Sequence, residues 1–147
     1  MNLSCFKAYD IRGRFPDVLN EDLARRIGCA YAAEFRPRRV VIGHDARLSG
    51  PSLYRALAEG LLAAGTDVTG IGLCGTEEIY FASFAEDFDG GIMVTGSHNP
   101  ADENGFKLVR KGAVPVSGDS GLQSIRERVA SDSFMRSERR GRYAEAD

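Results

Sequence analysis

The chain has 147 residues, of which 43% are apolar and 27% charged, values typical of one globular domain with its own core. A net charge of −2 and a pI near 5.7 supply no basic face for a phosphate backbone, which argues against a nucleic-acid partner. No window of the sequence approaches the ~20 apolar residues that span a bilayer, so we expect no membrane partner.

Three cysteines, Cys5, Cys29 and Cys74, are widely spaced and form no CxxC pair. An odd and scattered set favours reduced thiols over a disulfide framework or a zinc site. The first residues include Lys7 and Asp10, where a signal peptide would need an uninterrupted apolar core. We therefore expect a cytoplasmic protein whose mature chain begins where this sequence does.

Apolar runs alternate with helical patterns along the chain, which is typical of a layered α/β domain. Strands are expected at 6–11, 39–43, 67–72 and 89–95, and helices between 20 and 36, between 51 and 65, at about 77–86 and at 117–129. Asn104-Gly105 predicts a tight turn into a short return strand at 106–109. The pattern predicts a three-layer α/β/α domain on a mixed, mostly parallel sheet.

The sequence changes character at residue 131, where it loses periodicity and becomes mostly polar and charged. We interpret residues 1–130 as one domain and residues 131–147 as a linker toward an absent second domain. A disordered tail on a complete protein is the alternative.

The segment TGSHNPADENGFK, Thr95 to Lys107, directly follows the fourth expected strand. In open α/β sheets, ligands bind outside the carboxyl ends of the strands, so this segment is a candidate ligand loop. A purely structural turn is the alternative, because Gly, Ser, Asn and Pro are all turn formers. The segment GHDAR, Gly43 to Arg47, is interpreted as an Asx-type turn with a local salt bridge.

Ser97 would need a base within reach of its hydroxyl to act as a nucleophile. His98 is its immediate neighbour, and adjacent residues usually point apart, which argues against a Ser/His hydrolase. A phosphate carried on Ser97 would instead need cations and backbone donors around it. His98, Asn99 and Lys107 supply these within the segment, with Asn99 a candidate substrate-binding residue, and Arg12 lies in a strand-end loop that can face the same crevice. Lys107 is also a candidate acid or base for a sugar hydroxyl.

Four segments of the chain follow one another in a familiar order and spacing. They are FKAYDIRG (6–13), GHDARLSG (43–50), DGGIMVTGSHNPADENGFKLVR (89–110) and GDSGL (118–122). Together they resemble the first, N-terminal domain of the α-D-phosphohexomutases. The segment GLCGTEEIYFA (72–82) is most similar to the bacterial phosphomannomutase branch that feeds GDP-mannose synthesis, and RGRY (140–143) resembles the passage into the second domain.

The resemblance implies reversible transfer of phosphate between O1 and O6 of a hexose phosphate, through an enzyme phosphoserine and a hexose 1,6-bisphosphate intermediate. It implies that Ser97 is the phosphoserine, that its phosphate oxygen is one ligand of a bound Mg²⁺, and that His98 lies against the phosphate. Lys107 and Arg12 match residues with acid/base and charge-stabilising roles. Tyr9 matches a residue at the rim of the active site.

The implied substrates are mannose or glucose 1- and 6-phosphates, and the implied partners are further domains of the same chain. Those domains carry an Asp-x-Asp-x-Asp-Arg metal loop, a sugar loop and a Ser/Thr/Arg phosphate clamp, and none of these motifs occurs in this sequence. We therefore expect the chain alone to be inactive. Glu103 stands where the family often has tyrosine. Two alternatives stay open: a phosphoglucosamine mutase or phosphoglucomutase domain, and a sugar-phosphate-binding module without turnover.

Overall fold

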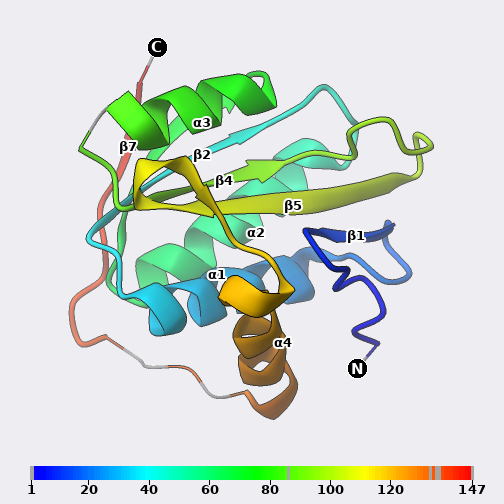
Figure 1. The fold of residues 1–147 in the computed structure, drawn as a ribbon, viewed down its shortest axis with the longest axis horizontal. Helices are drawn as coiled ribbons and strands as arrows, with labels where there is room; N and C mark the ends of the chain where they lie inside the picture. The colour runs from blue at the N-terminus through cyan, green and yellow to red at the C-terminus, as the bar shows by residue number, and fades with distance from the viewer. Residues whose placement is uncertain (1, 86, 133, 135–136, 147) are drawn as a thin grey trace.

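The computed structural model describes residues 2–85, 87–132, 134 and 137–146. Within them a single sheet has the order β1-β5-β4-β2-β3-β7, with β6 paired to β5 (Figure 1). The strands are β1 (Ile11–Arg14), β2 (Arg39–His44), β3 (Asp67–Leu73), β4 (Gly90–Val94), β5 (Glu103–Arg110), β6 (Val114–Pro115) and β7 (Tyr143–Glu145). The helices are α1 (Glu21–Phe35), α2 (Gly50–Ala63), α3 (Thr76–Ala85) and α4 (Leu122–Ser131), with short 3-10 turns η1 (Lys111–Ala113) and η2 (Gly118–Ser120).

Helices cover both faces of the sheet, with α1 and α2 on one face and α3 on the other (Figure 1). The larger apolar cluster lies under α1 and α2, and a smaller one under α3 includes Val41, Ile79 and Met93. Strands β4, β2, β3 and β7 run parallel, whereas β1, β5 and β6 pair antiparallel. The predicted α/β/α domain on a mixed sheet is confirmed. No helix in the described part of the chain is long and apolar enough to cross a membrane.

The ends of α1 and α2 follow the signals in the sequence. The Asn20 side chain accepts a hydrogen bond from the Leu23 amide at 2.9 Å, which satisfies one of the free N–H groups at the start of α1. Pro51 lies in the first turn of α2, where its missing N–H costs nothing. The helix ends before Gly65, whose φ of +90° is readily adopted by glycine. These helix predictions are confirmed.

The predicted first strand at 6–11 is wrong, because the chain turns there instead of extending. The Lys7 amide donates to the Asp10 carbonyl at 2.8 Å, and Phe6 bridges back to Ile11. Phe6, half-buried, and Ile11, buried, face each other across this turn, while residues 7–9 between them are exposed. The strand β1 therefore begins at Ile11, where the prediction ended it.

The predicted turn at Asn104-Gly105 is also wrong, since both residues lie within β5. The Asn104 side chain donates to the Ser49 hydroxyl at 2.8 Å and accepts from the Gly105 amide at 2.9 Å. A Cβ on Gly105 would lie 2.1 Å from the Ile11 carbonyl oxygen. Glycine is therefore needed here because β1 approaches closely, and the return strand is longer than the expected 106–109.

Two helix boundaries differ from the predictions. The helix expected at 117–129 is divided, because Gly121 at φ +126° separates η2 from α4. The third helix begins at Thr76, one residue earlier than expected, and its expected last residue, Glu86, lies outside the described residues.

The C-terminal segment returns to the sheet as β7, which pairs with β3. The Tyr143 hydroxyl lies 2.8 Å from the Tyr54 hydroxyl on α2, and the Arg140 guanidinium contacts both carboxylate oxygens of Glu59 at 2.7 Å. This strand was not predicted from the sequence. Positions 133, 135, 136 and 147 of the predicted linker lie outside the described residues, and the second domain to which that linker would lead stays a prediction.

Candidate active site

The loop between β4 and β5, residues 95–102, carries Ser97 at the carboxyl end of β4. Ser97 is exposed, and its φ of +53° lies in the left-handed region that few non-glycine residues occupy. Its amide donates to the Thr95 hydroxyl at 2.9 Å, and the Asn99 amide donates to the Gly96 carbonyl at 2.9 Å. Local hydrogen bonds thus fix the conformation of the loop around Ser97.

Asp45, at the end of the neighbouring strand β2, forms hydrogen bonds with the start of this loop. Its Oδ2 accepts hydrogen bonds from the Thr95 hydroxyl at 2.8 Å and from the Gly96 amide at 3.2 Å. Its Oδ1 accepts from the Arg47 amide at 3.2 Å, and the Arg47 Nε lies 3.6 Å from Oδ2. The predicted Asx turn and local salt bridge are confirmed.

Arg47 makes the most extensive contacts with the loop. Its guanidinium donates to four backbone carbonyl oxygens, those of Ser97 (3.0 Å), Asn99 (2.7 Å), Glu103 (3.0 Å) and Pro100. A Cβ on Gly96 would lie 2.2 Å from Cζ and Nε of this guanidinium, so only glycine leaves room for it. These contacts were not predicted from the sequence. The sequence marks GHDAR as a turn after an apolar strand, but only the fold shows that this strand lies next to the one that leads into the loop.

Arg12 and Asn99, two of the predicted site residues, are brought together. The Arg12 NH1 group donates to Asn99 Oδ1 at 3.3 Å, and its Nε donates to Asp10 Oδ1 at 3.1 Å. Arg12 pairs with Gly105, and Lys107 lies two residues further along β5. Because side chains alternate along a strand, Arg12 and Lys107 leave the sheet on the same face.

Tyr9 and His98 stay exposed. The Tyr9 side chain lies in the bend before β1 with 81% of its surface exposed, and His98 lies next to Ser97 in the loop. Neither side chain has a hydrogen-bond partner within the described residues, and the same is true of the Ser97 hydroxyl. Among the residues that the structure describes, no base is therefore bonded to the Ser97 hydroxyl as a serine hydrolase would need. Glu103 accepts a hydrogen bond from the Asn99 amide group at 3.1 Å.

The described residues do not form a complete magnesium site by themselves. The described residues contain no group of three or more His, Cys, Asp or Glu that could hold a metal ion. Asp45, the carboxylate bonded to the loop, is already used by the loop's own donors. Ser97 would therefore contribute a single ligand, fewer than the octahedral shell of Mg²⁺ requires.

Cys74, which follows β3, is no nucleophile at neutral pH. Its amide donates to the His44 carbonyl at 2.9 Å, next to the GHDAR turn. Burial, together with the negative charge of Glu78, raises the pKa of its thiol to about 11. The thiolate is the reactive form, so the raised pKa disfavours a nucleophilic role for this side chain at neutral pH.

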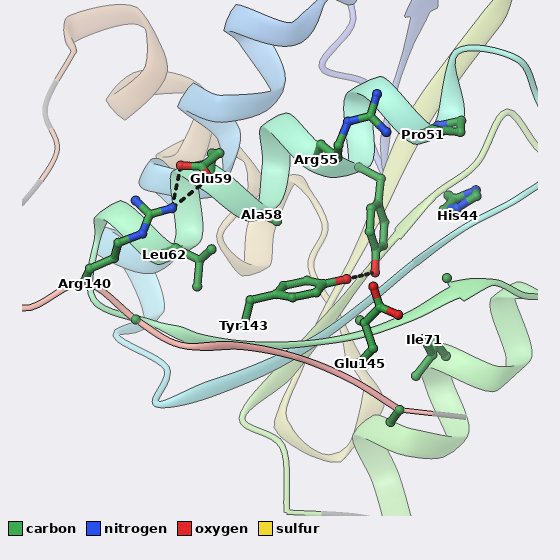
Figure 2. Close-up of a pocket in the computed structure, with 15 residues that line it drawn as sticks. His44, Pro51, Arg55, Ala58, Glu59, Leu62, Ile71, Arg140, Tyr143 and Glu145 are labelled. Carbon is green, nitrogen blue, oxygen red and sulfur yellow. Dashed lines mark hydrogen bonds and ion pairs between the residues drawn. The ribbon is translucent and has the colours of Figure 1, made fainter.

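A separate cavity of about 930 Å³ lies between α2 and the C-terminal segment (Figure 2). Its walls include the paired hydroxyls of Tyr54 and Tyr143 and the ion pair of Glu59 with Arg140. Burial, and then the hydrogen bond with Tyr143, raises the pKa of Tyr54. None of the predicted site residues lines this cavity, so the chemistry argued from the sequence lies at the loop.

A family of known proteins matches most of the chain, including the segment that holds this loop. Residues 4–136 match the family model described as phosphoglucomutase/phosphomannomutase, alpha/beta/alpha domain I. The chain belongs to this family. The resemblance inferred from the four segments is confirmed.

Relatives and solved structures of the phosphoglucomutase/phosphomannomutase family agree with this assignment. The chain is 60% identical over 132 residues to "Phosphohexose mutases" of Xanthomonas campestris pv. campestris, covering 90% of this chain and 30% of that protein. It is 57% identical over 132 residues to a phosphomannomutase of Klebsiella pneumoniae, covering 90% and 84%. A phosphoglucomutase/phosphomannomutase family protein from Burkholderia thailandensis superimposes with a TM-score of 0.92 at 42% identity, covering 100% and 34%. The chain thus spans less than a third of the Xanthomonas protein.

Proposed function

We propose that this chain is the phosphoserine-bearing N-terminal domain of a phosphomannomutase, which interconverts hexose 6-phosphate and hexose 1-phosphate. The observation that carries the proposal is the loop itself. Ser97 is exposed at the end of β4, Arg12 donates to Asn99 of the same loop, and Lys107 shares a sheet face with Arg12. The names of the relatives support mannose phosphate as substrate, with glucose phosphate as the related choice.

In the proposed reaction, the phosphate of Ser97 passes to a free hydroxyl of the hexose phosphate. The bond between phosphorus and Ser97 Oγ breaks as the bond between phosphorus and the sugar oxygen forms. Lys107, in its neutral amine form, takes the proton of the sugar hydroxyl and, as the ammonium, returns it to Ser97 Oγ. Arg12 and His98 balance the negative charge on the moving group, which is the main demand of phosphoryl transfer. The reverse step, from the other end of the hexose 1,6-bisphosphate, restores the phosphoserine.

Tyr9 and Asn99 are proposed to contact the sugar phosphate from the rim and from the loop. A bound Mg²⁺ would neutralise charge on the phosphate, with an oxygen on Ser97 as its contact to this chain. The remaining ligands and the sugar-binding groups would come from further domains, and residues 131–147 would lead toward them. We propose that the whole protein works in the cytoplasm and that residues 1–147 alone do not catalyse the reaction.

The test is whether Ser97 carries an exchangeable phosphate in the complete protein as its gene encodes it. Incubation with glucose 1,6-bisphosphate should raise the intact mass by one phosphate, and peptide fragmentation should locate the phosphate at Ser97. S97A should take up none, while S124A, a matched change on α4, should behave like the wild type. A wild-type protein with no exchangeable phosphate at Ser97 would overturn the proposal.

A further inference from the structure

We propose that Arg47 is a positioning residue that holds the Ser97 loop in its phosphate-accepting shape. This inference rests on the proposed function, because it assigns a role in the same phosphoserine site. Arg47 lies outside the sequence motif around Ser97 and precedes Ser97 by fifty positions. The connection exists only in the folded chain, where β2 lies beside β4.

The terminal N–H groups of the Arg47 guanidinium all bond to backbone carbonyls at the Ser97 loop. A guanidinium has five N–H groups, and four of them belong to the two terminal nitrogens. NH1 donates to the carbonyls of Pro100 and Glu103, and NH2 donates to those of Ser97 and Asn99. The fifth N–H, on Nε, faces Asp45 at 3.6 Å. All four terminal N–H groups are thus bonded to backbone carbonyls, and the Nε–H lies beside Asp45 without a hydrogen bond to it, so Arg47 acts on the loop rather than on a substrate phosphate.

The contact with the Ser97 carbonyl also orients the next amide. In a trans peptide the C=O and the following N–H point in opposite directions. Because the Ser97 carbonyl points at Arg47, the His98 N–H points away from Arg47. This amide has no backbone or side-chain partner within the described residues. It is a free donor beside Ser97, of the kind that stabilises a transferring phosphoryl group.

The chemistry of this contact requires arginine. The side chain of Arg47 is only 14% exposed, and its hydrogen bonds to the Glu103 and Asn99 carbonyls are partly buried, where a hydrogen bond is stronger than in water. A lysine has three donors on one nitrogen and no planar fork, and it cannot span four carbonyls spread over seven residues. Replacing arginine by lysine would keep the charge and lose the geometry.

The experiment compares R47K and R47Q with the wild type in the complete protein. We expect both variants to lower kcat for mannose 1-phosphate by roughly 100-fold, because displacing a reacting group by about 1 Å costs about that much. The KM should change by less than about threefold, since Arg47 does not contact substrate. Transfer of phosphate from glucose 1,6-bisphosphate onto Ser97 should slow in parallel.

The matched control is R14K. Arg14 also contacts the loop, but through one exposed ion pair with the Asp102 side chain at 3.0 Å, and it holds no loop carbonyl. We expect R14K to keep kcat within about twofold of the wild type.

The outcomes separate this inference from the proposed function. A wild-type protein that takes no phosphate on Ser97 overturns the proposed function. If the wild type is phosphorylated on Ser97 and R47K keeps more than a third of the wild-type kcat, the role of Arg47 is overturned. A large rise in the KM of R47K with an unchanged kcat would overturn it as well. If R47K and R47Q fail to fold, D45N decides. It keeps an oxygen for the Thr95 hydroxyl but loses the charge beside Arg47, and we expect kcat to fall about tenfold; an unchanged kcat overturns the inference.

Discussion

Replacing Gly105 with alanine should displace β1 and with it Arg12. A Cβ at this position lies 2.1 Å from the Ile11 carbonyl oxygen and 3.0 Å from the Arg12 Cγ. Ordinary van der Waals contact begins at 3.4 Å, so β1 would have to retreat by about 1.3 Å, the difference between 3.4 and 2.1 Å. Because β1 is a four-residue edge strand that pairs with β5, it can move without disrupting the rest of the sheet.

This retreat would break the contact between Arg12 and the loop. The Arg12–Asn99 hydrogen bond is already 3.3 Å long, so a further ångström takes it beyond hydrogen-bond range. Misplacing a catalytic group by about 1 Å can cost roughly 100-fold in rate. We expect G105A to lower kcat/KM for mannose 1-phosphate by about that factor in the complete protein.

The assay is steady-state turnover together with thermal unfolding, so that loss of activity can be separated from loss of structure. Gly112 provides a control without a steric clash, because no atom would lie within 4 Å of a Cβ at this position; its φ of +77°, which Gly105 does not share, adds only local backbone strain. We expect G112A to retain activity within about threefold. A folded G105A protein with wild-type kcat/KM would refute the idea that β1 positions Arg12.

Two further predictions concern stability. G60A should lower the Tm by several degrees, because its Cβ would lie 2.0 Å from the Arg25 carbonyl oxygen on α1. The overpacking costs about 3 kcal/mol, which exceeds the ~1 kcal/mol gained in helix propensity. An unchanged Tm in differential scanning calorimetry would contradict this. Burial raises the pKa of the Cys5 thiol from 9.0 to about 11, so its contribution to stability is complete below pH 9 and is lost as the pH rises through 11. Iodoacetamide should accordingly label Cys5 at pH 8 at least tenfold more slowly in the native protein than in urea, and equal rates would argue against burial.

Features set by neighbouring residues could be predicted from the sequence. The start of α1 depends on Asn20 and the amide three residues later, and the end of α2 on Gly65, so the pattern of residue types was sufficient. Asn104-Gly105 shows the limit of this reasoning. The same dipeptide that favours a tight turn lies within β5, because Gly105 is needed where Ile11 approaches it and Asn104 bonds to Ser49. Those partners are distant in the sequence.

The candidate site divides in the same way. The position of Ser97 at the end of a strand could be inferred from the apolar run before it. The support from Asp45 and Arg47 could not be predicted, because it depends on β2 lying next to β4, and these strands are separated in the sequence by α2, β3 and α3. Sheet order is decided by packing across the whole domain, which local patterns do not record.

Strand β7 also keeps other copies of the chain from pairing with β3. It occupies the outer side of β3, where the Val68 amide donates to the Arg142 carbonyl and the Ala146 amide donates to the Gly70 carbonyl. Without these partners β3 would become a seven-residue parallel edge, and such edges pair readily with other chains. A version cut at residue 130 would therefore tend to aggregate through β3. An expression fragment intended to stay monomeric should retain the chain through at least Ala146.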